Sequence, residues 1–552
     1  MPPLPSEHQA SSGLGPQAND PVRTPPSREQ TARRALICLW CVALFITLLI
    51  QVPGLGNSDT AIRLQTTRSW WTDEPPVRTA TNAPFGITGL NGVIHAWYGA
   101  GQSALMLPAD LVAGLLDHRI HDPESKLRVR SGIVATLTFP PLVATTVVLV
   151  FLWLGQLGFT PIECWVGALG MMLGTSYFSY TQNHMENSLQ VFLLATDAVL
   201  IGRWMRTGSR GCLLLAGLSI GAALTVRLPA LGEHFGIWMS AILCCGFQAR
   251  RQAQDANEKL TWARINHSYR PLQVLALVSP GLLLGILVDR FYHWIRFGHW
   301  TGTYVSLMAK KMLLRDPRLS PNFPFDGNFW DGFWGPLVAP GRGLLFFDPL
   351  AIVLLGLVLW QWKKISTPVR CALIGLGIGH LILLIFYARV SFWEGGGVWG
   401  NRYTLTPVHL ALAMTLPLWL RLLGWKSALT LNLLPTTIFV AGTIQILSIL
   451  LPASVEVGQI DNQSQATPVP IQRAINVVNL LRGMPPLAGL TSKEWRINLA
   501  PATLSMGNPR LARVLWLGWG LAVGGALILL LRSWRAVLAW DDLQAEESDA
   551  EA

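Results

Sequence analysis

The chain has 552 residues, of which 51% are hydrophobic and only 13% are charged. A soluble domain carries about twice that charged fraction, so the composition excludes an ordinary soluble protein. The formal net charge of +11 comes from short groups of Lys and Arg between apolar runs. Such groups are typical of signals that orient membrane helices, and they argue against nucleic-acid binding.

The first 34 residues are rich in Pro, Ser and Gln and show no apolar periodicity. We expect residues 1–34 to form a disordered cytoplasmic tail. Apolar runs of the length that a helix needs to cross a bilayer, roughly 20 residues, follow from there to near the C-terminus. The sequence therefore predicts an all-α, polytopic membrane helical bundle of about twelve transmembrane helices, at 35–53, 131–155, 163–181, 188–203, 211–228, 231–248, 271–294, 343–361, 370–388, 403–424, 428–450 and 511–532.

Lys and Arg near the ends of these runs predict the orientation of the bundle in a cell (inner or plasma) membrane. The loops 202–210, 248–264 and 361–370 are basic and should face the cytoplasm together with the N-terminus. The segment 100–116 is apolar but short, and Pro108 and Asp110 interrupt it. We expect it to lie in the outer interface or to be re-entrant.

This orientation divides the chain into four parts and places the outer loops on one side. We expect a transmembrane region, 35–450, which includes the first outer loop 54–130. It lies between the tail 1–34 and a short extracytoplasmic segment, 451–510, and a last helix with a cytoplasmic tail, 511–552, follows. The outer loops are 54–130, 297–342, 389–402 and 451–510.

The sequence predicts neither a disulfide framework nor a metal site. All seven cysteines lie in or beside apolar runs, and no His/Cys cluster has zinc-ligand spacing, so we interpret them as small core residues. They are Cys38, Cys41, Cys164, Cys212, Cys244, Cys245 and Cys371.

The first outer loop contains three candidate acids. Asp59 follows the first predicted span closely, and Asp73 and Glu74 come one loop-length later. A carboxylate at the mouth of a membrane cavity suits a general base acting on a hydroxyl group. Asp59 in "SDT" also fits a helix N-cap. Tyr98, in "WYGAG", is a candidate for the substrate pocket or for an aromatic belt at the membrane surface.

Two further outer turns contain charged residues. His184 and Glu186 lie in "NHMENS", which fits either a substrate contact or an ordinary polar turn, and two such side chains are too few for a metal site. Arg342 lies between two glycines, where it could bind a phosphate or extend to lipid headgroups.

The stretch "FWEGGGVWGNRY" (392–403) is predicted to be a short outer loop. Its glycines permit backbone close to the membrane, and Trp393 and Trp399 are amphipathic enough to border a headgroup pocket. Arg402 begins the next span, where a helix N-terminus favours phosphate. We interpret Glu394 as a partner for an arginine, and a tight loop anchored by aromatic residues is the structural alternative.

Six stretches in this order resemble the GT-C membrane glycosyltransferases, in the branch of protein O-mannosyltransferases and lipid A aminoarabinose transferases. They are the acidic first loop with Asp59, "WYGAGQSALMLP" (97–108), "NHMENSL" (183–189), "IRFGHWTGTY" (295–304), "PGRGLLFFDP" (340–349) and "WEGGGVWGNRY" (393–403). The stretches span most of the chain, and their order is more specific than any one of them.

The resemblance implies a polytopic helical fold that uses a polyprenyl-phosphate-linked sugar on the outer side of the membrane. By position, Asp59 matches the family's catalytic acid, although "SDT" replaces the Asp-Glu pair common in the mannosyltransferases and leaves Asp73 and Glu74 as alternatives. A departing phosphate needs positive charge, and Arg342 and Arg402 are the candidates to bind it. No cofactor is certain, and a divalent metal could take the place of one arginine. The chain has no large soluble C-terminal domain, so the acceptor stays open.

Two other classes of function fit the sequence less well. A transporter or flippase of a lipid-linked or anionic substrate would often show repeated halves and polar sites near the midplane, whereas here the Gly- and Trp-rich stretches cluster on one predicted face. A degenerate relative that serves as a membrane scaffold is the third alternative.

Overall fold

The computed structural model describes residues 27–78, 86–116, 119–255, 271–452, 455–456, 459, 467–485, 495–505 and 508–551. Most of the predicted tail, residues 1–26, lies outside this set. Residues 28–34 do not belong to a tail: they form the first turns of the first helix, which Ser27 and Gln30 cap reciprocally.

The described chain is predominantly helical. Its only strands form one short antiparallel hairpin, in which Gly86 pairs with Ala96. In chain order, the elements are α1 (Arg28–Ile50), α2 (Ser58–Arg68), β1 (Gly86–Thr88), η2 (Leu90–Gly92), β2 (Ile94–Ala96), α4 (Gly101–Gly114), α5 (Pro123–Gln156), α6 (Pro161–Gly174), α7 (Tyr177–Gln182), α8 (Glu186–Thr207), α9 (Arg210–Val226), α10 (Ala230–Asp255), α12 (Pro271–Phe297), α13 (Tyr304–Arg315), α14 (Phe329–Val338), α15 (Leu344–Phe347), α16 (Leu350–Gln361), η4 (Trp362–Lys364), α17 (Thr367–Tyr387), α18 (Thr406–Ala413), α19 (Thr415–Leu423), α20 (Ala428–Leu450), α22 (Val469–Leu481), α23 (Ala500–Leu504) and α24 (Pro509–Glu551).

Within the described residues, nine helical segments are long and apolar enough to cross a membrane. The protein is thus an all-α bundle of the multi-pass membrane type, but the predicted count of twelve spans is not reached. The predicted spans 163–181, 211–228 and 343–361 correspond to shorter helices, α6 with α7, α9, and α15 with α16.

The short helices have local causes. Helix α9 stops at Val226, three residues before Pro229, which cannot supply an amide hydrogen to the helix. Pro349 separates α15 from α16, and the preceding Asp348 accepts a 2.9 Å hydrogen bond from the Ser176 hydroxyl. Ser176 lies between α6 and α7, so the two interrupted segments meet inside the bundle, where each satisfies a polar group of the other.

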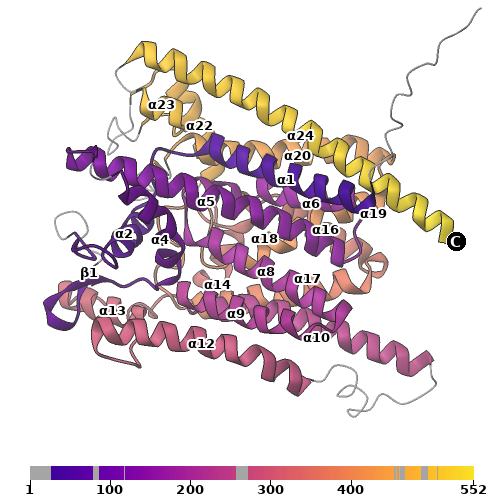
Figure 1. The fold of residues 1–552 in the computed structure, drawn as a ribbon, viewed down its shortest axis with the longest axis horizontal. Helices are drawn as coiled ribbons and strands as arrows, with labels where there is room; N and C mark the ends of the chain where they lie inside the picture. Colours follow the sequence, from indigo (N-terminus) through magenta and orange to yellow (C-terminus); the bar gives the residue numbers. More distant parts are fainter. Residues whose placement is uncertain are drawn as a thin grey trace, which may run out of the picture.

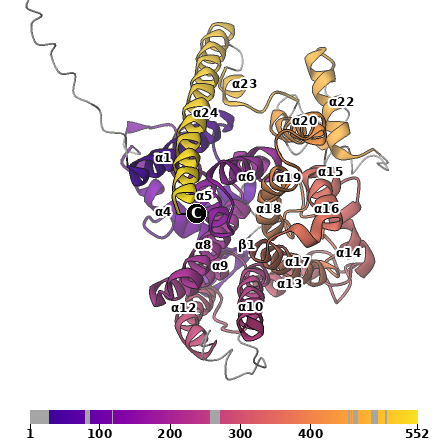
Figure 2. The same ribbon diagram turned by 90° about the vertical axis from the view of Figure 1, so that its right-hand side faces the viewer.

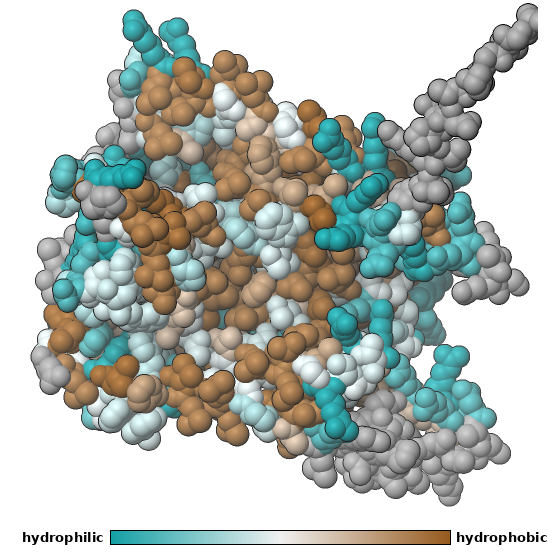
Figure 3. All heavy atoms as spheres, in the orientation of Figure 1, coloured by the Kyte–Doolittle hydropathy of each residue, from teal (hydrophilic) through white to brown (hydrophobic). Residues whose placement is uncertain are grey.

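The basic loops gather at one end of the bundle. There Arg206, at the end of α8, donates to the carbonyl of Gly155 at the end of α5, and Arg421 pairs with Glu163 at the start of α6. Arg28 pairs with Glu547, so the start of α1 and the end of α24 share this end (Figure 1). Figure 2 shows the molecule along the helices, with this end facing the viewer. Between the two ends, Figure 3 shows a belt of hydrophobic residues flanked by hydrophilic ones, as a bilayer requires.

Two helix pairs pack through glycines. A Cβ on Gly217 of α9 would lie 2.3 Å from the carbonyl oxygen of Val278 in α12, and one on Gly285 would lie 2.3 Å from Gly221. Helices α10 and α17 meet in the same way, through Gly236 and Gly375. Each of the four helices carries two glycines four positions apart, an arrangement that lets backbones approach closely in membranes.

The opposite end of the bundle, at the left of Figure 1, carries α2, α4, the hairpin and α13. The segment predicted at 100–116 is the helix α4, which buries Gln102, Ser103 and Asp110 and exposes Leu111 and Leu115. It packs on α5 and α2. These elements form the framework around the candidate site.

Candidate active site

Asp59 lies in the first turn of α2 and is not the residue that caps it. The cap is Asn57, whose side-chain oxygen accepts a 2.8 Å hydrogen bond from the Thr60 amide. Asn57 also donates to the carbonyl of Asn183. The N-cap interpretation of Asp59 is therefore wrong, and its carboxylate is available for tertiary contacts.

Both carboxylate oxygens of Asp59 have tertiary partners. The Tyr98 hydroxyl donates to Oδ1 at 2.7 Å, and Nη1 of Arg402 lies 3.0 Å from Oδ2. Burial opposes the ionisation of this partly buried group. The charges of Arg402 and Arg63 and the hydrogen bond from Tyr98 outweigh burial, so the pKa of Asp59 lies below its ordinary value. Asp59 is therefore an anion at neutral pH.

Arg63 is a member of the site that sequence reasoning missed. Its guanidinium lies over the ring of Tyr98, 4.0 Å from the centroid, and it forms an ion pair with Glu186 at the start of α8. Arg63 follows Asp59 by four positions on α2, so both residues share one face of that helix. This spacing of four residues is visible in the sequence and could have been used to predict that Arg63 belongs to the site.

The backbone around Arg402 is held by buried polar side chains. Its carbonyl accepts hydrogen bonds from the Asn187 amide at 2.6 Å and from Arg227 at 3.4 Å. Arg227 in turn pairs with Glu233. The loop itself depends on Gly395, which has φ +80° and on which a Cβ would lie 3.0 Å from Cγ of Arg402. Gly395, one of the glycines of this loop, thus lets the loop fold against Arg402.

A cavity of about 1210 Å³ opens beside this cluster. Its polar end contains Asp59, Arg63, Tyr98, Glu186, Arg227 and Arg402. The remaining wall is mostly apolar and comes from α10, α13, α17 and the segment before α14. Several of its side chains are exposed at the bundle surface: Leu228, Leu231, Leu314, Phe325 and Phe386. Lys310 of α13 also lines the cavity.

Arg342 and Trp399 are not among the residues that line this cavity. Arg342 is buried and donates to the carbonyl of Val398, and burial lowers its pKa. Trp399 packs edge-on against Phe347, with ring centroids 4.9 Å apart, and contacts the guanidinium of Arg473. Of the two predicted phosphate-binding arginines, only Arg402 lines the cavity, whereas Arg342 donates to the backbone of the loop 392–403.

Trp393, Glu394 and His184 do not line the cavity either. The Trp393 ring packs on Gly335 of α14, where a Cβ would lie 2.3 Å from it. Glu394 is partly buried. Its charge acts on Arg342.

His184 is fully buried, adopts φ +51°, and packs its ring 4.8 Å from that of Phe139. Burial lowers the pKa of His184 to about 4, so the ring is neutral. Its carbonyl accepts 2.8 Å and 3.0 Å hydrogen bonds from Thr60 and Gln102. The backbone of His184 therefore anchors α2 and α4. Of the two candidate residues that the sequence suggested in this turn, only Glu186 lines the cavity.

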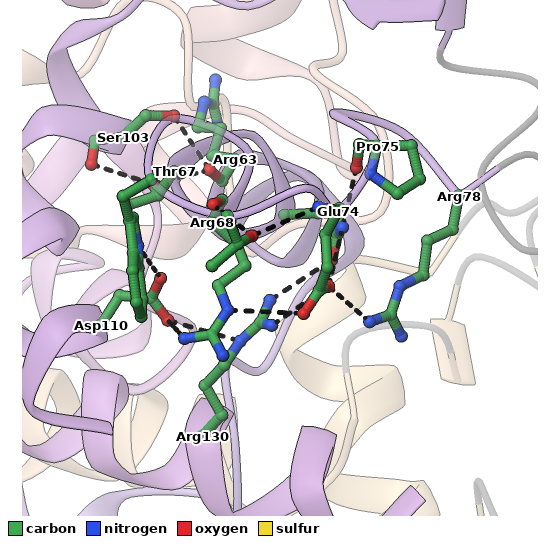
Figure 4. Close-up of polar contacts among 12 residues, drawn as sticks. Arg63, Thr67, Arg68, Glu74, Pro75, Arg78, Ser103, Asp110 and Arg130 are labelled. Carbon is green, nitrogen blue, oxygen red and sulfur yellow. Dashed lines mark hydrogen bonds and ion pairs between the residues drawn. The ribbon is translucent and has the colours of Figure 1, made fainter. Parts of the chain in front are cut away.

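The two alternative acids lie elsewhere. Glu74 belongs to an ionic cluster with Arg68, Arg78, Arg130 and Asp110 (Figure 4). Burial opposes its ionisation, but hydrogen bonds from Arg78 and Gln65 and the charge of Arg130 lower the pKa of Glu74 to about 2. Asp73 is exposed. Neither residue lines the cavity, which leaves Asp59 as the candidate acid with access to it.

Among the residues that the structure describes, no group of three or more His, Cys, Asp and Glu side chains is arranged to hold a metal ion. Comparison of the chain with models of known protein families and with curated proteins finds no match.

Proposed function

We propose that this protein is an integral membrane glycosyltransferase. It would transfer a sugar from a polyprenyl-phosphate donor to an extracytoplasmic acceptor, which is an envelope glycan, a lipid or a protein. The end of the bundle with the basic loops would face the cytoplasm, and the end with Asp59 would face outward.

The observation that supports this best is the division of one cavity into two chemical halves. One part of its lining brings the anion Asp59 together with the cations Arg63 and Arg402, whereas the rest is mostly apolar and includes exposed side chains such as Leu314 and Phe386. A charged headgroup attached to a long hydrocarbon chain needs both environments at once. A water-soluble sugar nucleotide needs only the first.

In the proposed reaction, an acceptor hydroxyl oxygen attacks the anomeric carbon of the donor sugar. The carbon–oxygen bond to the phosphate breaks, and the lipid phosphate leaves with the electron pair. Asp59 accepts the proton of the attacking hydroxyl group. Arg402 stabilises the negative charge that gathers on the departing phosphate.

The contacts of Asp59 suggest how binding of the donor frees one of its oxygens to act as a base. In the structure, Arg402 and Tyr98 each engage one of its two oxygens. A donor phosphate that binds Arg402 competes with Asp59 for the guanidinium. The oxygen released in this way can then accept a proton, so the base becomes available when the donor is bound.

The test is transfer by purified protein from a panel of polyprenyl-phosphate sugars, with envelope extract as the source of acceptor and release of lipid phosphate as the signal. Asp59→Asn should abolish release while the protein still inserts and folds. The matched control is Asp73→Asn, which changes an exposed acid of the same loop and should stay active. Full activity of Asp59→Asn would refute the assignment of the base.

The alternative function is a transporter or flippase of a lipid-linked or anionic substrate, which the same two-sided cavity also accommodates. Reconstitution in vesicles distinguishes the two functions. Movement of the lipid-linked sugar across the bilayer without release of lipid phosphate would favour the transporter.

A further inference from the structure

A separate pocket of about 170 Å³ lies between α5, α8, α10 and α17. Its lining includes Arg206 in the last turn of α8 and Pro368 in the first turn of α17. The large cavity uses the opposite ends of the same two helices, at Glu186 and Tyr387. About twenty residues separate the two levels on each helix, which is about 30 Å at the rise of an α-helix. The Arg206 end of the pocket therefore lies about one bilayer thickness from the candidate active site, whereas on α10 its lining begins at Ile237, five residues from Gly232 of the large cavity.

The pocket is long and narrow. On α10, its lining runs along one helical face from Ile237 to Gln248, a length of about 16 Å. On α8, it runs from Ala198 to Arg206, a length of about 12 Å. This extended lining suits a single hydrocarbon chain.

The chemistry of the lining changes along its length. Apolar side chains, such as those of Trp153, Ile237 and Ala241, form the deep part. Gln156, Arg206 and Gln248 line the part nearest the basic end. The Nε2 of Gln156 donates to the carbonyl of Val199 at 3.1 Å, while its buried Oε1 accepts no hydrogen bond from the described part of the chain. The polar part thus has both a cation and an unused acceptor.

Further arginines lie near the polar part of this pocket. Arg203 and Arg210 lie near it in sequence at the end of α8 and the start of α9, and Arg250 and Arg251 follow Gln248 on α10. Basic pockets between membrane helices at this level bind anionic headgroups.

We propose that this pocket binds one anionic phospholipid. An acyl chain would fill the apolar slot, the phosphodiester would bind Arg206, and a headgroup hydroxyl would donate to Gln156. The inference does not depend on the proposed glycosyltransferase activity, because it concerns the opposite end of the molecule.

The experiment measures lipid binding to the purified, detergent-solubilised protein by native mass spectrometry and by the shift in thermal unfolding temperature. The probes are phosphatidylglycerol, phosphatidylcholine with the same acyl chains, and glycerol phosphate without chains. We expect phosphatidylglycerol to bind and to raise the unfolding temperature, and the other two probes to have little effect. Equal stabilisation by phosphatidylcholine would overturn the role of the charge, and equal stabilisation by glycerol phosphate would overturn the role of the slot.

Two variants locate the site. Arg206→Gln should weaken phosphatidylglycerol binding by about fivefold, the usual contribution of one basic residue at an anionic membrane surface. Arg203→Gln removes the same charge from the same helix end, but Arg203 does not line the pocket, so its effect should be smaller. Equal losses in both variants would mean nonspecific attraction.

Ala241→Leu fills the slot and should reduce binding while leaving Arg206 in place. Its folding is checked by its unfolding temperature without lipid. Undiminished binding by a folded Ala241→Leu protein would contradict the proposal.

Discussion

Arg402 and Asp59 are separated by 343 positions in the chain, and Nη1 of Arg402 lies 3.0 Å from Oδ2 of Asp59. The pair joins the first turn of α2 to the loop before α18. Three further residues surround this pair: Tyr98 after β2, Arg63 in α2 and Glu186 at the start of α8. Tyr98 donates to Asp59, and Arg63 contacts both Tyr98 and Glu186. The chemistry proposed for the cavity depends on this single junction.

Arg402→Ala should lower kcat/KM for a lipid-phosphate sugar by about ten- to a hundredfold. The reason is the loss of a hydrogen bond to a charged group, which contributes about 1.5–3 kcal/mol. Steady-state kinetics with the panel of donors checks this. The control is Arg318→Ala, because Arg318 is exposed and pairs with Asp316, and neither residue lines the cavity. A loss of equal size in the control would mean that the effect is not specific to the site.

The dependence of activity on pH should identify Asp59 as the base. Because the pKa of Asp59 is lowered, the wild-type kcat/KM should stay constant from neutral pH down to about pH 4, the ordinary value for an aspartate, and fall only below it. In Arg402→Ala, a charge that lowers this pKa is gone, so the acid limb should move to higher pH. A limb that does not move would indicate another base.

Glu74→Gln should lower stability in a way that depends on pH. The pKa of Glu74 is lowered from 4.5 to about 2 in the folded protein. Its stabilising contribution is therefore fully present above pH 4.5 and disappears as the pH falls toward 2. Thermal unfolding in detergent across this range should show that wild type and Glu74→Gln differ at pH 7 and converge in acid. A constant difference would show that the ionic cluster in Figure 4 is not its cause.

Gly221→Val should separate α9 from α12. A Cβ on Gly221 would lie 2.3 Å from the carbonyl oxygen of Gly281 in α12, and overpacking of this kind typically costs about 1–3 kcal/mol. The measurement is the unfolding temperature in detergent. Gly377→Val of α17 is the matched control, because a Cβ there meets no atom within 4 Å. If both variants lose the same stability, helix propensity rather than close packing is responsible.

The sequence alone was enough to predict a helical multi-pass membrane protein, because apolar runs and basic loops are local properties of the chain. Each of the twelve predicted spans contains a helix. Only nine helical segments of the described chain have the length and apolarity of a membrane span. Pro229 follows the end of α9, Pro349 separates α15 from α16, and Thr175 and Ser176 separate α6 from α7, and a hydropathy average does not register these breaks. The paired glycines of α9, α10, α12 and α17 were also visible in the sequence, although their partners were not.

The choice among the candidate site residues depended on tertiary structure. Asp59, Tyr98, Glu186 and Arg402 share one cavity, whereas Arg342, Trp399 and His184 face other parts of the bundle. Composition and spacing indicate which residues lie near a helix end, but they do not determine which neighbour a side chain meets there. That depends on how helices hundreds of residues apart pack against one another, and the packing places Arg402 beside Asp59 and leaves Glu74 in a separate ionic cluster.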